Sequence, residues 1–213
     1  VKLVELSDLT TTNSNGEFVF KSLNPDTYSL KVFHEDFADK TISVTVKSHE
    51  TSKPEIKLTA NPGSVKGTTQ PNAAITVQET SDSTTADSSG NFQIDGLAEG
   101  DYTLEFNHSN YKTKTQSISI TKNETNNIGT TSLEPKEGSI TGTTQANATV
   151  SFAGQSTTAG TEGNFTIGNI TPDSYTLTIE HTDYHSISND YSISPNQDKD
   201  VGTIDLDPKE GNI

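Results

Sequence analysis

The sequence contains no cysteine, methionine, tryptophan or arginine. Without cysteine, disulfide bonds, thiolate catalysis and cysteine-ligated metals are excluded. Without arginine, the planar fork that binds phosphate or carboxylate in bidentate fashion is missing, because all 14 basic residues are lysine. Acidic residues number 29, and the formal net charge is −15. This charge opposes nucleic acid and anionic membranes, so we expect the chain to bind neither.

Long apolar runs are also missing. None approaches the length of a membrane span, so we expect no membrane insertion. The opening VKLVELSDLT has no apolar core of the kind found in a signal peptide. The absence of disulfides fits either the cytosol or a bacterial surface, and the many Ser, Thr, Asn and Asp residues favour the surface. We therefore expect a secreted or cell-surface bacterial protein whose signal sequence lies upstream.

The apolar residues that are present occur in short alternating runs, such as YTLEF, YTLTI, SISI and SVTV. Alternation with a period of two is typical of half-buried β-strands. No stretch keeps a helical period, so the sequence predicts an all-β protein.

One long segment occurs twice. GSVKGTTQPNAAITV begins at Gly63, and GSITGTTQANATVSF begins 75 positions later at Gly138. Residues 8–37 also align without a gap with residues 82–111. Such a period indicates a tandem array. We predict repeats at residues 1–60, 61–135 and 136–208. The first lacks its initial strand, since Val1 aligns with Ile75. Residues 209–213 begin a fourth repeat, since DPKEGNI matches EPKEGSI.

Each complete repeat is expected to hold about seven strands. In the second we place them near residues 64–68, 74–78, 84–87, 91–94, 102–107, 113–120 and 129–133. DSSGN and NSNGE predict hairpin turns in which glycine takes a positive φ. Seven short strands in about 75 residues favour a small β-sandwich. The joins are short, contain proline and have no Gly/Ser tract, which favours an extended array over the alternative of ordinary hinges.

At these residues the chain resembles the carboxypeptidase regulatory-like domains, which have the prealbumin (transthyretin-like) sandwich fold. The second repeat carries GSVKGTT…AAITV, DSSGNFQIDGLAEGDYTLEF and Tyr111; the third carries GSITGTT…ATVSF, TEGNFTIGNITPDSYTLTI and Tyr184. The resemblance implies non-catalytic accessory or repeated modules of secreted and surface proteins.

A more distant resemblance is to the collagen-adhesin B-type repeats of Gram-positive surface proteins, which share the pattern G.F.…L..G.Y.L. That resemblance implies a Lys–Asn isopeptide cross-link. The sequence argues against one, because Lys66 alternates with Val65 and so faces outward, and Thr141 replaces it in the third repeat.

Three of the five histidines share one repeat position: His34, His108 and His181. One interpretation is a metal or pH-sensitive site at the end of each repeat. The interpretation we favour is an imidazole that tethers a turn through hydrogen bonds to the backbone. We expect no cofactor. The metal site we consider is calcium at a join, held by Glu134 and Glu137, against the favoured alternative of a solvated turn.

No nucleophile elbow, phosphate-binding glycine loop or zinc-helix motif occurs, so we expect no enzyme. We predict a stalk or spacer that holds another domain away from a bacterial surface, with the neighbouring repeats of a longer array as its partners. The alternative is an adhesion module that binds a glycan or host protein through loops or edge strands. A further hypothesis pairs a second chain's tail with the opened edge of the first repeat.

Overall fold

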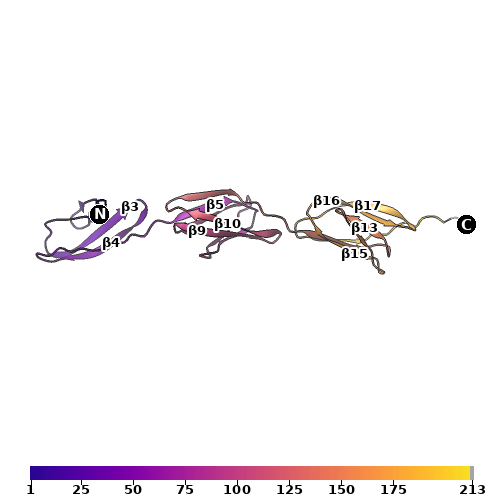
Figure 1. Ribbon diagram of the computed structural model, residues 1–213, viewed down its shortest axis with the longest axis horizontal. Helices are drawn as coiled ribbons and strands as arrows, with labels where there is room; N and C mark the ends of the chain where they lie inside the picture. The colour runs from indigo at the N-terminus through magenta and orange to yellow at the C-terminus, as the bar shows by residue number, and fades with distance from the viewer. Residues whose placement is uncertain (212–213) are drawn as a thin grey trace. The chain divides into compact units, whose positions relative to one another are not determined.

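The computed structural model describes residues 1–211 and contains eighteen strands, β1 to β18, and no helix within that range (Figure 1). The all-β prediction is therefore confirmed. The chain divides into two compact units, and the division passes through the second repeat: one unit comprises residues 1–67, 93–102 and 117–129, and the other comprises 68–92, 103–116 and 130–213. The predicted start of a fourth repeat at 209–213 lies partly outside the described residues.

The third repeat lies within one unit and shows the architecture in full. One sheet has the order β14–β13–β16–β17, built from β13 (Thr149–Phe152), β14 (Gln155–Thr158), β16 (Ser174–His181) and β17 (Tyr184–Ser192). The other has the order β15–β12–β18, built from β12 (Gly138–Thr143), β15 (Asn164–Ile170) and β18 (Asp198–Thr203). Strand β12 is central, antiparallel to β15 and parallel to β18.

The inward side chains of these two sheets form one apolar core. Phe152, Leu177 and Ile179 come from the four-stranded sheet, and Ile140 and Phe165 come from the three-stranded sheet. All five are at most 4% exposed. A β-sandwich is held together in this way, because alternate residues of each strand share one face.

The second repeat has the same strand order. Its four-stranded sheet is β10–β9–β6–β7, from β6 (Ala74–Val77), β7 (Ser83–Thr85), β9 (Gly100–His108) and β10 (Tyr111–Ile120). Its three-stranded sheet is β11–β5–β8, from β5 (Gly63–Thr68), β8 (Asn91–Leu97) and β11 (Thr125–Thr130). As predicted from the alternation, Val65 is buried and Lys66 is exposed.

The first repeat differs from the expected sandwich. It has a single sheet, β2–β1–β3–β4, from β1 (Lys2–Leu3), β2 (Asp8–Leu9), β3 (Asp26–His34) and β4 (Phe37–Val46). We predicted that only the initial strand would be absent. In the described chain, residues 17–23 and 50–58, which correspond to β8 and β11, are not strands either. The reason is topological: β8 and β11 each pair with β5, so both lose their partner when the central strand is missing.

The predicted hairpin glycines have the expected backbone. Gly16, Gly90 and Gly163 have φ values of 78°, 84° and 78°. In the second repeat the turn is closed by Asp87, whose Oδ1 accepts the backbone N–H groups of Ser89 and Asn91, both at 2.8 Å. The Asn91 side-chain amide, and then its backbone N–H, hold the pKa of the Asp87 carboxyl below its usual 3.8.

We predict that Asp87→Asn removes part of the acid sensitivity of folding. A carboxyl with a lowered folded pKa contributes stability above its unfolded pKa and loses it as pH falls through the folded pKa. The stability advantage of the native chain over Asp87→Asn should therefore shrink as pH falls from 6 towards and below 3.8. Denaturant unfolding across this range measures it. Asparagine is a matched replacement, since Asn13 closes the equivalent turn of the first repeat. A constant difference would contradict the prediction.

Each central strand begins at a tightly packed glycine. A Cβ atom on Gly138 would lie 2.5 Å from Ile193 Cγ2 and 2.6 Å from the Gln197 carbonyl oxygen, closer than real Cβ contacts allow. A Cβ atom on Gly63 would collide in the same way with the Thr121 carbonyl oxygen. Glycine is therefore required sterically at the entry to each complete repeat.

We predict that Gly138→Ala lowers the free energy of unfolding of the third repeat by about 1–3 kcal/mol, the usual cost of overpacking. Gly168→Ala is the control. Gly168 lies in the same three-stranded sheet, a Cβ there would meet nothing within 4 Å, and its φ is not positive. Thermal and denaturant unfolding should show a lower free energy of unfolding for Gly138→Ala than for Gly168→Ala. Equal stabilities would contradict the steric argument.

Candidate functional site

The three repeat-equivalent histidines occupy one structural position. In each repeat the imidazole lies at the end of the Tyr-containing strand, and its Nδ1 accepts a backbone N–H two residues further on. The N···N distances are 3.2 Å for His34 with Asp36, 3.1 Å for His108 with Asn110, and 3.1 Å for His181 with Asp183. Nδ1 is therefore the acceptor atom in all three turns.

Each imidazole also packs edge-on against the aromatic residue that opens the next strand. Ring centroids are 5.4 Å apart for His34 and Phe37, 5.0 Å for His108 and Tyr111, and 4.9 Å for His181 and Tyr184. The structure therefore gives all three rings a turn-tethering position and the same aromatic neighbour.

The tethered turn holds the start of the following linker. In the second repeat, the backbone N–H of Lys136 donates to the Asn110 carbonyl at 2.9 Å, and its Nζ donates to the Ser109 carbonyl at 2.8 Å. The N–H of Lys112 donates to the Glu134 carbonyl at 2.8 Å. We call these three bonds the linker clasp. Two of the three are backbone–backbone bonds, so they do not depend on which side chains occupy these positions.

The linker clasp occurs three times with nearly identical distances. Backbone bonds at 2.9 Å and 2.8 Å recur in every copy, and the side-chain bond measures 2.8–2.9 Å. The equivalent side-chain donors are Asn61, Lys136 and Lys209, and the accepting carbonyls belong to Glu35, Ser109 and Thr182. Asparagine and lysine thus make the same bond with side chains of different length.

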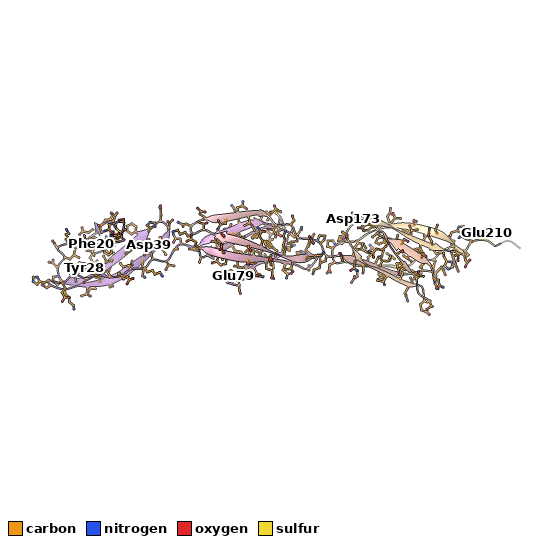
Figure 2. All side chains as sticks on the ribbon, in the orientation of Figure 1. Phe20, Tyr28, Asp39, Glu79, Asp173 and Glu210 are labelled. Atoms are coloured by element: carbon orange, nitrogen blue, oxygen red, sulfur yellow. The ribbon has the colours of Figure 1, made fainter. Side chains whose placement is uncertain are left out.

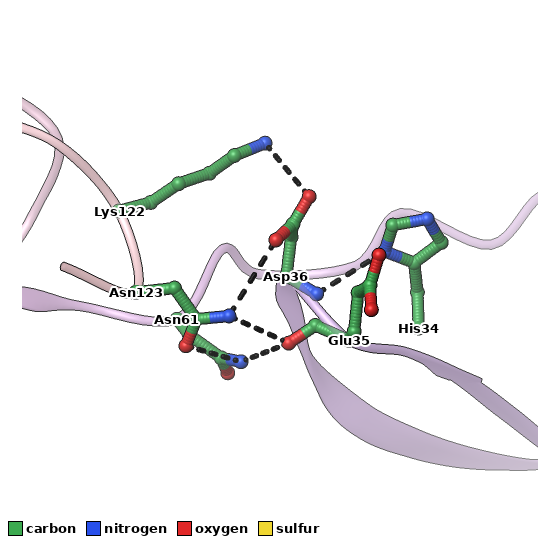
Figure 3. Close-up of polar contacts among 6 residues, drawn as sticks. All are labelled: His34, Glu35, Asp36, Asn61, Lys122 and Asn123. Carbon is green, nitrogen blue, oxygen red and sulfur yellow. Dashed lines mark hydrogen bonds and ion pairs between the residues drawn. The ribbon is translucent and has the colours of Figure 1, made fainter.

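At the first join, residues of the second repeat extend the clasp (Figure 3). The Asn123 side-chain amide donates to the Glu35 carbonyl at 2.8 Å, and Lys122 Nζ lies 3.6 Å from the Asp36 carboxylate. Lys122 Nζ also lies 4.9 Å from the centroid of the Phe37 ring, within the range of a cation–π contact. Asn123 has a φ of 62°, a conformation that asparagine tolerates better than most residues.

The second join has fewer contacts of this kind. The N–H of Asn196, which is equivalent to Asn123 and has a φ of 58°, donates to the Lys136 carbonyl at 3.1 Å. Pro195 replaces Lys122, and Asn110 replaces Asp36, so the ion pair has no counterpart. The two joins therefore share the linker clasp and differ in charge.

The residues considered for calcium do not form a ligand cluster. The Glu134 carboxylate lies 3.6 Å from Lys112 Nζ, with its side chain 81% exposed, and Glu137 is exposed. Across residues 1–211, no group of three or more His, Asp or Glu residues is placed to hold a metal ion. Calcium binding at this join stays an untested prediction.

Each of the three repeats matches a known domain family. The model of the carboxypeptidase regulatory-like domain matches three times, at residues 1–59, 63–134 and 137–207. The chain belongs to the carboxypeptidase regulatory-like domain family. The resemblance seen in the sequence is thus confirmed, and with it the tandem organisation. Comparison with curated protein sequences gave no match.

Several solved structures are similar to these carboxypeptidase regulatory-like repeats. The Bacillus anthracis TIE protein is 17% identical, with a TM-score of 0.40 over 88% of this chain and 43% of its own, so this chain spans less than half its length. BcpA, the major pilin subunit of Bacillus cereus, is 13% identical, with a TM-score of 0.36 over 93% and 89%. The Streptococcal ancillary pilin is 12% identical, with a TM-score of 0.34 over 88% and 76%.

The sequence singled out the histidines but not the linker clasp of these regulatory-like repeats. A signal was present, because Lys136 and Lys209 both stand two residues before a glycine in the repeated PKEG. In the first repeat Asn61 stands in place of this lysine, so the pattern is broken there. The accepting carbonyls belong to residues of different types. Every residue has a backbone carbonyl, so the amino-acid sequence does not show which carbonyls accept these bonds.

We predict that His181→Ala accelerates hydrogen exchange of the Asp183 amide roughly 2- to 12-fold, the factor that corresponds to one hydrogen bond. His185→Ala is the control, since that exposed side chain makes no hydrogen bond within the described residues. Exchange followed by NMR resolves the single amide. Unchanged exchange in His181→Ala would show that the imidazole does not tether the turn.

Proposed function

We propose that the chain is a non-catalytic spacer of a secreted or cell-surface bacterial protein, and that its repeats hold another domain away from the surface. The observation that carries this proposal is the linker clasp, which recurs in all three repeats. A clasp that fixes the linker at each exit limits bending, and restricted bending is what a spacer requires. The repeats beside one another in the array are its partners.

The composition supports the same role. A net charge of −15 keeps neighbouring molecules apart and the surface hydrated. Residues 1–211 contain no helix that could span a membrane. Regulatory-like domains of this family are accessory modules. Three of the five histidines, the residues best suited to acid–base chemistry at neutral pH, are engaged in turns.

Small-angle scattering tests the proposal. A compact chain of this length should have a radius of gyration of about 17 Å. Three repeats in line, on the order of 100 Å long from the strand rise, should give roughly 30 Å. We expect the larger value. A value near 17 Å would overturn the spacer and favour a folded-back surface, to be tested for glycan or host-protein binding as an adhesion module.

A second experiment removes side-chain contacts at the first join. Asn61→Ala combined with Lys122→Ala removes the side-chain part of the first clasp and the ion pair with Asp36. We expect a broader distribution of distances between spin labels placed in the first and second repeats. Lys112→Ala is the control, because its partner Glu134 lies in the same repeat and its clasp bond comes from the backbone. An unchanged distribution would mean that these side chains do not restrict the join.

A further inference from the structure

The first and last strands of each complete repeat lie side by side. In the third repeat β12 runs parallel to β18, with Ser139 opposite Asp198 and Thr143 opposite Thr203. The N–H of Ile204, the residue that follows β18, donates to the Thr143 carbonyl at 2.9 Å. We call β12 and β18 the terminal-strand pair of this repeat, and β5 and β11 the terminal-strand pair of the second.

Three hydroxyl groups of the repeated GSITGTT segment cross the terminal-strand pair of the third repeat. Their bonds are Ser139 Oγ to Asp198 Oδ1 at 2.6 Å, Thr143 Oγ1 with Thr203 Oγ1 at 2.8 Å, and Thr144 Oγ1 to the Ile204 carbonyl at 2.8 Å. Cross-strand hydroxyl bonds of this kind add to the backbone ladder. The two strands are therefore joined by side chains as well as by their backbones.

The second repeat makes the same three bonds from its GSVKGTT segment. They are Ser64 Oγ to Thr125 Oγ1 at 2.9 Å, Thr68 Oγ1 with Thr130 Oγ1 at 2.7 Å, and Thr69 Oγ1 to the Thr131 carbonyl at 2.9 Å. The partners follow one another in the same direction along both strands, so this pair is parallel too. The serine and the two threonines that recur 75 positions apart thus share one structural role, which is to bind the last strand or the residue after it.

The second glycine of the segment allows the two strands to approach closely. A Cβ atom on Gly142 would lie 2.8 Å from Val201 Cγ2 and 2.9 Å from the Gly202 carbonyl oxygen, both on β18. Real Cβ atoms do not come this close, so glycine is required here sterically. The glycine and the three hydroxyl residues of GSITGTT all serve the contact between β12 and β18.

The chain enters and leaves the third repeat at opposite ends of this pair. It enters at Gly138, the start of β12, and leaves after Thr203, the end of β18, towards Glu210 (Figure 2). Because the two strands are parallel, a pull on both ends of the repeat slides one strand along the other. Sliding loads the backbone and hydroxyl bonds together, whereas peeling the strands apart would load them one after another.

We propose that the terminal-strand pair resists pulling force, and that the complete repeats transmit tension along the chain as well as setting a distance. Bearing tension goes beyond spacing, because an extended array can still unfold under a weak pull. A chain under tension survives when its forced unfolding is slow. The hydroxyl bonds are suited to slow it, since they lie across the strand pair that a pull on the repeat slides.

Force spectroscopy on single molecules of the full chain tests the proposal in two pulling directions. The chain has no cysteine, so two introduced cysteines are the only attachment points. Glu137→Cys with Glu210→Cys slides the terminal-strand pair of the third repeat. Glu137→Cys with Ser194→Cys peels it, because Ser194 precedes β18 and Gly138 packs against Ile193 and Gln197 at the same end of the pair.

We expect the third repeat to unfold at a clearly higher force when the pair is slid than when it is peeled. Both measurements load the same native repeat, so a difference cannot come from a change in its stability. Equal forces in the two directions, or a higher force on peeling, would overturn the proposal.

A matched pair of double substitutions tests the hydroxyl bonds under constant sliding force. Thr143→Val with Thr144→Val removes two hydroxyl bonds of the terminal-strand pair. The lifetime of the folded repeat should shorten roughly 5- to 150-fold, the factor that corresponds to two hydrogen bonds. The control is Thr176→Val with Thr178→Val, which removes two hydroxyl bonds between β16 and β17 in the other sheet of the same repeat.

The control should keep the native lifetime under sliding force, whatever its free energy of unfolding in denaturant. Equal shortening in both double variants would mean that the hydroxyls contribute only general stability. No shortening in Thr143→Val with Thr144→Val would mean that they bear no force, and either result contradicts the assigned role. These outcomes are independent of the scattering test, because the shape of the array and the strength of one repeat are separate properties.

Discussion

The structure depends on one strand, the centre of the three-stranded sheet. In the third repeat β15 and β18 have no other partner in that sheet than β12, and Ile140 on β12 is fully buried in the core. An extended segment with unpaired N–H and C=O groups is not stable against an apolar face unless those groups find partners. The first repeat shows the consequence, because its apolar pattern is retained while residues 17–23 and 50–58 form no ladder.

The same strand connects folding to the geometry of the joins. Gly138 begins β12 and lies two residues after Lys136, whose backbone and side chain form the linker clasp. Only Glu137 therefore lies between the clasp residue Lys136 and the first residue of β12.

Backbone hydrogen bonds carry more of this geometry than side-chain charges do. The first join has the Lys122–Asp36 pair and the second has none, yet both keep the same backbone bonds. Partly exposed ion pairs contribute little free energy and are screened by salt. The hairpin turns also do not require one particular side chain. Equivalent turns are closed by the Asn13 amide, by the Asp87 carboxylate and, at Gly160, by backbone bonds alone.

The sequence by itself indicated most strands of the complete repeats, the glycine turns and the family, because alternation, positive φ and repetition are local or periodic properties. Gly90 and Val65 are examples, each predictable from its neighbours. The last strand of the second repeat was placed too late in the chain, at residues 129–133, whereas β11 spans Thr125–Thr130. Only the tertiary structure decided the order β11–β5–β8 and the linker clasp. The strand order depends on pairing between segments far apart in the chain. The clasp depends on carbonyl groups that every residue possesses, so no residue type predicts it.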